Sequence, residues 1–193
     1  MKLLVLLGTV ISACFGSIYL VATIKGKVQP NRVTWLLWSL SPMSATIVAI
    51  STGISWSILP VFMAGFMLFL IFLGSFINKS AYWKISLLDL LCAALSIGTL
   101  VIWKMTNEPN LAVLFAILSD ALAALPTYIK IWLFPYTERP FFYIGGTFSA
   151  LTSLIAAPNN KLTTIGFAVY LVVLNTSLML LIYFRQKKFS SSN

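Results

Sequence analysis

Long apolar runs separated by short polar turns dominate this chain of 193 residues. A helix needs about 20 predominantly apolar residues to cross the hydrocarbon core of a bilayer. Seven runs approach this length, and we expect a spanning helix in each of them: residues 3–24, 33–53, 56–78, 86–103, 110–134, 141–157 and 162–184. The connections leave no room for a separate soluble domain. The pattern therefore predicts an all-helical polytopic membrane protein with seven transmembrane helices.

The composition agrees with a membrane protein and excludes several soluble classes. Apolar residues make up 60% of the chain and charged residues 9%, whereas soluble domains are about half apolar and a quarter charged. Charge and cysteine are too scarce for a disordered chain, a disulfide scaffold or a coiled coil. Cys14 and Cys92 both lie within apolar runs, so we interpret them as small hydrophobic residues.

The basic residues indicate an orientation in the membrane. The 13 Lys and Arg outnumber the 4 Asp and Glu, and they are dispersed between apolar runs, which does not favour nucleic-acid binding. With the N-terminus outside, the cytoplasmic side receives ten of them: Lys25, Lys27, Arg32, Lys79, Lys84, Lys130, Arg139, Arg185, Lys187 and Lys188. The outer side keeps Lys2, Lys104 and Lys161. This bias predicts an outer N-terminus and a basic cytoplasmic tail at 185–193.

The first apolar run has two interpretations. Lys2, the apolar stretch and the segment Ile11-Ser12-Ala13-Cys14 are typical of a lipoprotein signal peptide cleaved before Cys14. The apolar run nevertheless continues to Ile24, and its charged start is a single lysine. We expect the first helix to be retained.

A short pattern recurs at the cytoplasmic ends of two predicted helix pairs. The matched positions are Ile24-Lys25 with Ile129-Lys130, Pro30 with Pro135, Asn31-Arg32 with Glu138-Arg139, and Trp35 with Phe142. We expect two parallel three-helix repeats, 1–78 and 110–184, joined by an inverting linker helix within 79–109. Chance recurrence of basic turns is the alternative. Parallel repeats are a common transporter architecture, with the substrate near the midplane between the halves.

This 3+1+3 arrangement resembles the SWEET and PQ-loop transporter superfamily. The segment Leu125-Pro126-Thr127-Tyr128-Ile129-Lys130 is similar to the PQ-loop signature, in which Pro-Gln precedes a basic cytoplasmic turn. Thr127 stands where the family has Gln, and Val21-Ala22 stand where the first proline pair would fall. The resemblance implies alternating access and a small solute of the sugar, amino-acid or vitamin class. It also implies that Asn175, on the last helix, is similar in position to an asparagine that flanks the substrate.

Asp120 is the most informative polar residue, because it lies near the middle of the predicted helix 110–134. A carboxylate at that depth costs at least about 2.5 kcal/mol to insert, so it must face a cavity or a partner. We expect it to couple transport to protons or to bind a substrate amine. The alternative is a structural carboxyl that ties helices together. Asp89, near the start of the fourth predicted helix, is expected to be a tether or to favour the helix N-terminus.

Three further sets of residues complete the expected site. Substrate binding is assigned to Asp120, Asn175, Trp38, Tyr19 and Ser149, with helix packing and interhelical hydrogen bonding as the alternatives for Asn175 and the small polar residues. Trp35 and Trp38 share one face of their predicted helix. Two interpretations of these rings are open, an aromatic belt at headgroup level and stacking on a solute.

A cytoplasmic gate or collar is assigned to Lys25, Arg32, Lys130, Glu138 and Arg139, with plain topology signalling as the alternative. Pro42, Pro60 and Pro126 interrupt predicted helices and are the expected hinges.

The chain contains no histidine, which excludes Ser-His and Cys-His catalysis and imidazole-based metal sites. We expect no enzyme activity, no metal and no cofactor. The predicted function is a transporter that moves a small polar solute across a membrane, most simply a bacterial plasma membrane, with homo-oligomerisation left open. The alternative is a non-transporting seven-helix receptor or assembly factor, which would bind a partner with the same fold.

Overall fold

The computed structural model describes residues 2–52, 58–79, 83–105, 108–157 and 159–190. Within these ranges the chain is helical apart from short turns and contains no β-strand. The seven α-helices are α1 (Lys2–Ile24), α2 (Arg32–Thr52), α3 (Ile58–Gly74), α4 (Leu87–Met105), α5 (Pro109–Leu133), α6 (Phe141–Ile155) and α7 (Leu162–Ser190), with a 3-10 turn η2 (Pro135–Thr137) before α6. The predicted all-helical fold is confirmed, with seven α-helices in the described ranges.

The helix ends follow local sequence signals. Gly26 ends α1 with a left-handed backbone (φ 67°), and the N–H groups of Gly26 and Lys27 donate to the carbonyls of Thr23 and Ala22. This is the pairing of a Schellman motif. At the start of α2, the Asn31 side-chain oxygen accepts from the N–H groups of Val33 and Thr34, so Asn31 is the N-cap. These signals place the first interhelical turn between residues 25 and 31.

One expected boundary differs from the structure, and another falls on residues that the structure does not describe. Helix α7 continues to Ser190, so the predicted tail 185–193 begins inside this helix. The third predicted run begins at residue 56, which lies outside the described residues, and α3 is described from Ile58. Pro60 lies two residues after Ile58, and because residues 53–57 are outside the described structure, its predicted hinge role stays a prediction.

Three helical segments of the described chain are long and apolar enough to cross a membrane: Lys2–Ile24, Val113–Leu133 and Ile165–Lys188. Two shorter apolar segments accompany them, Phe62–Gly74 and Phe141–Ile155. Large apolar side chains are exposed along the bundle, and Leu91 and Leu95 of α4 are examples. Such a surface is unfavourable in water and favourable against lipid tails, so the fold is compatible with an integral membrane protein.

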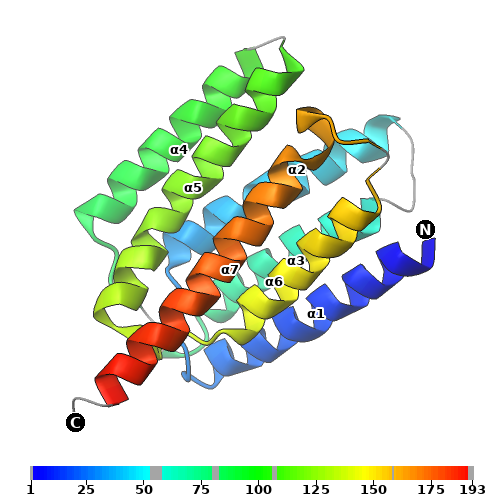
Figure 1. Ribbon diagram of the computed structural model, residues 1–193. Coiled ribbons are helices and arrows are strands. Elements are labelled where there is room, and N and C mark those ends of the chain that lie inside the picture. The colour runs from blue at the N-terminus through cyan, green and yellow to red at the C-terminus, as the bar shows by residue number, and fades with distance from the viewer. Residues whose placement is uncertain (1, 53–57, 80–82, 106–107, 158, 191–193) are drawn as a thin grey trace.

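Six helices pack in a closed order around the bundle, and α4 lies outside it (Figure 1). Helix α1 packs on α3, α3 on α2, α2 on α5, α5 on α7, α7 on α6, and α6 on α1. Helix α4 packs on α5 and α2. Exchanging α1 with α5, α2 with α6 and α3 with α7 reproduces the same six contacts, so the order has the form of a two-fold arrangement with α4 as the odd helix.

The sequence-matched residues Trp35 and Phe142 contact each other across the boundary between α1–α3 and α5–α7. Their ring centroids are 4.7 Å apart with the planes at 62°. Residues related by a two-fold axis contact one another only where they lie close to that axis. The contact between Trp35 of α2 and Phe142 of α6 is therefore what a two-fold relation between the helix pairs would give.

Small residues bring α1 and α6 close together along the same boundary. A side-chain carbon on Gly145 would lie 2.6 Å from Cβ of Phe15, and one on Gly8 would lie 2.7 Å from Oγ1 of Thr152. Neither position has room for a larger residue without movement of the neighbouring helix. This close packing agrees with the use of small residues at helix interfaces in membranes.

Candidate functional site

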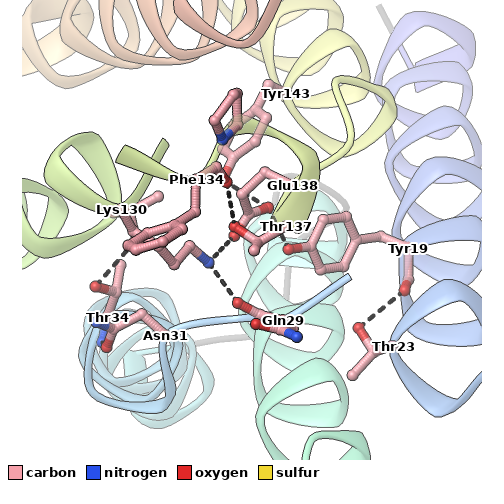
Figure 2. A network of polar contacts seen from close by, with 12 residues as sticks. Tyr19, Thr23, Gln29, Asn31, Thr34, Lys130, Phe134, Thr137, Glu138 and Tyr143 are labelled. Carbon is pink, nitrogen blue, oxygen red and sulfur yellow. Dashed lines mark hydrogen bonds and ion pairs between the residues drawn. The ribbon is translucent and has the colours of Figure 1, made fainter. Parts of the chain in front are cut away.

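We call α1–α3 with their turns the first half of the bundle and α5–α7 with their turns the second half. The two halves meet in a buried polar cluster, which we define as Tyr19, Gln29, Lys130, Glu138 and Tyr143 (Figure 2). It lies at the end of the bundle where α1, α3, α5 and α7 finish and where the C-terminus lies (Figure 1). Its centre is an ion pair between Nζ of Lys130, near the end of α5, and Oε1 of Glu138, just after η2. Both side chains are 0% exposed.

The first half of the chain supplies partners for both members of this pair. The Lys130 ammonium also donates to the main-chain oxygen of Gln29, and the Tyr19 hydroxyl donates to Oε2 of Glu138. The main-chain N–H of Gln29 donates to the carbonyl of Thr137 at 2.8 Å. The charges belong to the second half, but groups from α1 and the α1–α2 turn complete their coordination.

These extra partners explain how the pair tolerates burial. Removing two charges from water costs several kcal/mol per ion, and this cost is offset only when good geometry and additional hydrogen bonds satisfy both groups. The Tyr143 hydroxyl contributes a longer contact of 3.5 Å to Oε2 of Glu138. The ring of Trp83 faces the Lys130 ammonium, 5.6 Å from centroid to nitrogen, which adds a cation–π contact.

A second set of polar contacts joins α2 to α5. Oγ1 of Thr34 donates to the carbonyl of Ala123 at 2.7 Å, and Oγ1 of Thr127 lies 3.2 Å from Oγ1 of Thr34. Both threonine side chains are fully buried. Thr127 is the residue that stands where the PQ-loop signature has Gln, and here it contacts the other half of the bundle.

Helix α4 is attached to α2 through a buried carboxylate. Asp89 accepts from Nδ2 of Asn31 at 2.7 Å and from Oγ of Ser86 at 2.8 Å, and it is 2% exposed. Ser86 precedes α4 and Asp89 lies in its first turn, so together they form a capping box. Ser86 is thus the N-cap of α4, and Asp89 completes the capping box and tethers α4 to the start of α2.

Asp120 lies deeper in the bundle, about midway along α5. Its Oδ2 atom accepts from the Tyr170 hydroxyl of α7 at 2.8 Å, and its main-chain oxygen accepts from Nε1 of Trp38 at 3.2 Å. Tyr170 was missed by sequence reasoning. Its signal was a tyrosine inside an apolar run, but nothing in the sequence pairs it with Asp120.

The remaining predicted substrate-binding residues do not gather around Asp120. Asn175 is buried, and its Nδ2 atom donates to the Leu171 carbonyl of its own helix at 2.8 Å. Ser149 is half-buried and contributes its carbonyl to hydrogen bonds within α6. Tyr19 belongs to the buried polar cluster. The predicted set is therefore divided between a position near Asp120, the interior of α6 and α7, and the cluster.

The predicted collar is also divided. Lys130 and Glu138 form the buried pair, whereas Lys25 and Arg139 are exposed. The Arg32 guanidinium donates to Oγ of Ser75 at 3.0 Å and to its carbonyl at 2.6 Å, and it lies over the Phe76 ring at 3.9 Å. Arg32 thereby ties α2 to the end of α3, within the first half of the chain.

Two of the three predicted hinge prolines lie inside helices, and Trp35 lies in the core of the bundle. Pro42 and Pro126 lie inside α2 and α5, which continue beyond them, and Pro60 lies in the described part of α3 with its side chain outside the described part of the structure. Trp35 is fully buried and stacks on the Tyr19 ring. The aromatic-belt interpretation of Trp35 is therefore wrong, because a belt residue exposes its ring at the membrane interface.

Neither a family model, nor a curated protein, nor a solved structure matches this chain. Within the described ranges, no three His, Cys, Asp or Glu side chains lie together in a way that could hold a metal ion. The function is therefore inferred from the buried polar groups and their partners in this chain.

Proposed function

We propose that this protein is a SWEET-like membrane transporter that moves a small polar solute by alternating access. The moving parts are the segments 1–78 and 110–184, and 79–109 links them so that both have the same orientation. The N-terminus lies outside and the C-terminus in the cytoplasm, which puts the buried polar cluster at the cytoplasmic end. Support comes from the two-fold order of helix contacts and from the contact between Trp35 and Phe142.

The observation that carries the proposal is the Lys130–Glu138 pair completed across the boundary by Tyr19 and Gln29. A fully buried ion pair is a poor source of stability compared with well-packed apolar residues, so its presence between two halves favours a role in switching. Here it holds the cytoplasmic side shut. Opening that side separates the Tyr19 hydroxyl from Glu138 and the Lys130 ammonium from the Gln29 carbonyl.

A carboxyl in the middle of α5 also fits solute transport. Ionisable residues inside membrane helices are rare and generally face a partner or a pathway. Asp120 receives one described hydrogen bond, from Tyr170, on Oδ2, which leaves Oδ1 able to take a proton or a further donor. We assign Asp120 to proton coupling, with Tyr170 positioning its carboxyl group.

The direct test is solute uptake into liposomes that contain the purified protein. We expect saturable uptake of one member of a panel of sugars, amino acids and vitamins, and a change of at least about fivefold in its maximal rate in Glu138→Gln. Lys25→Gln is the matched control, since Lys25 is exposed, and it should leave uptake unchanged. Absence of saturable uptake, together with a protein partner that copurifies stably, would instead support the receptor or assembly-factor function.

Proton coupling is tested separately in the same vesicles. With Asp120 as the coupling group, an inwardly directed proton gradient accelerates wild-type uptake, and Asp120→Asn removes the acceleration while solute exchange without a gradient persists. If the gradient acts equally on wild type and Asp120→Asn, the carboxyl has a structural role and transport is facilitated diffusion or is coupled elsewhere.

A further inference from the structure

Trp35 carries a buried hydrogen-bond donor without an acceptor. Its side chain is 0% exposed, and its Nε1 atom has no hydrogen-bond partner in the described structure. Buried polar groups in folded proteins are nearly always paired, and an unpaired one calls for a specific explanation. The comparison within α2 is clear, because Nε1 of Trp38 donates to the main-chain oxygen of Asp120.

The rings around Trp35 come from both halves of the bundle. Tyr19 of α1 stacks on it with centroids 4.7 Å apart, Phe142 of α6 meets it edge-on at 4.7 Å, and Trp38 lies at 6.0 Å. The Tyr19 ring is the one whose hydroxyl holds Glu138. Any molecule that separates Tyr19 from Trp35 therefore also disturbs the buried polar cluster.

Building on the proposed transport function, we propose that Trp35 donates to the transported solute, which is an uncharged ring compound with a hydrogen-bond acceptor at its edge. An indole N–H is a donor only, so its partner must be an acceptor. Flat aromatic faces such as Tyr19 and Phe142 stack on a ring. The solute is uncharged because the carboxylate that Tyr19 holds, Glu138, is already neutralised by Lys130. An ionic solute beside Tyr19 and Trp35 would therefore be buried without a counter-charge.

The rings touch one another in this structure, so the solute replaces a ring–ring contact when the two halves separate. Tyr19 then moves together with the solute, which couples occupancy of the site to release of Glu138. Tyr19 therefore takes part both in binding of the solute and in opening of the cytoplasmic side. Sugars and neutral vitamin rings both have the required chemistry, and the experiment distinguishes them.

The test compares uptake of two uncharged rings, D-glucose and nicotinamide, with that of their charged counterparts, D-glucose 6-phosphate and nicotinate, and of the acyclic solutes L-lysine and L-glutamate. Trp35→Phe keeps an aromatic ring and removes the donor. We expect it to raise the half-saturating concentration of the transported ring about tenfold, equivalent to about 1.4 kcal/mol. The matched control is Trp132→Phe, at an exposed tryptophan, which should leave that concentration unchanged.

Each outcome of this experiment decides a different point. Uptake of an uncharged ring that is insensitive to Trp35→Phe overturns the inference and leaves the transport function standing. Uptake limited to charged or acyclic solutes does the same. Absence of saturable uptake for every solute in the panel overturns the proposed function and the inference with it.

Thermal unfolding without solute checks that the donor is unpaired and that the variant folds. Trp35→Phe and Trp38→Phe remove the same side-chain volume, but only the second removes a hydrogen bond made in this structure. We expect Trp35→Phe to unfold at a higher temperature than Trp38→Phe. Equal or greater loss in Trp35→Phe would mean that its N–H is already paired in the resting protein, which contradicts the inference.

Discussion

The clearest contrast in the molecule is between two lysines at matched positions of the repeated pattern. Lys25 follows α1 and is exposed, whereas Lys130, 105 residues later, lies near the end of α5 and is fully buried. Both precede a turn, a proline and the start of the next helix. The same sequence pattern therefore gives its lysine opposite environments, with Lys25 just beyond the end of α1 and Lys130 inside α5.

The difference arises from what each turn brings near the lysine. The second turn is two residues longer, since the offset is 105 from Lys25 to Lys130 and 107 from Asn31 to Glu138, and it contains η2. Glu138 turns back to Lys130. Its counterpart Asn31 instead caps α2 and binds Asp89 of α4. Because α4 has no second copy, the two turns cannot have the same neighbours.

The largest expected effect comes from breaking the buried pair. Lys130→Met leaves the Glu138 carboxylate buried without its ammonium partner, and such a change typically costs about 3–5 kcal/mol. We expect a loss of this size in the free energy of unfolding, measured by denaturant titration in detergent. The double variant Lys130→Met/Glu138→Leu removes both charges and should recover most of the loss. No recovery in the double variant would mean that the pair does not account for the effect.

A smaller loss is expected when the partner from the first half is removed. Tyr19→Phe deletes the hydroxyl that donates to Glu138, and a hydrogen bond to a charged group contributes about 1.5–3 kcal/mol. Tyr143→Phe is the matched control within the cluster, because its hydroxyl makes the longer contact of 3.5 Å. Unfolding in the same detergent should rank Tyr19→Phe below Tyr143→Phe in stability, and the reverse order would place the stronger bond on Tyr143.

A third variant tests why Asn31 does not behave like Glu138. Asn31→Ser retains an N-cap for α2 but removes the amide that donates to Asp89, so only the tether to α4 is lost. We expect destabilisation of about 1–2 kcal/mol from the weakened coordination of this buried carboxylate. Ser86→Ala, which removes the hydroxyl from the same carboxylate, is the comparison. Wild-type stability in both variants would show that Asp89 is not held by these groups.

The smallest effect is predicted at Lys25. Substitutions at exposed surface positions away from special contacts usually change stability by less than about 0.5 kcal/mol, so Lys25→Met should unfold like wild type. Set against Lys130→Met, this substitution changes the same residue type at the matched position of the repeat. A loss at Lys25 similar to that at Lys130 would remove the contrast between the two turns.

Much of the fold could be predicted from the sequence, because its signals are local. Apolar run length gave the seven helices, and short-range features such as Gly26 after α1 and Asn31 before α2 mark their ends. The exact reach of α7 could not be predicted, since Lys187 and Lys188 are polar but helix formers, and the helix continues through them.

The site was only partly predictable, because its contacts join distant residues. Lys130 and Glu138 were both expected in the collar, but the tyrosine that completes their coordination lies 119 residues before Glu138. Tyr170 and the unpaired N–H of Trp35 depend on which helix faces become neighbours. Helical periodicity assigns residues to a face of their own helix and does not say which helix packs against that face.

The most direct test of the central claim is a distance across the cytoplasmic end between the two halves. Spin labels at Lys79→Cys, after α3, and Lys187→Cys, near the end of α7, are suitable because both lysines are exposed, in a background with Cys14→Ala and Cys92→Ala. Double electron–electron resonance should give one short population of label-to-label distances in this labelled parent protein. Glu138→Gln should add a longer population, and Lys25→Gln should not. Identical distance distributions for folded Glu138→Gln and its parent would contradict the claim that the buried polar cluster holds the two halves together.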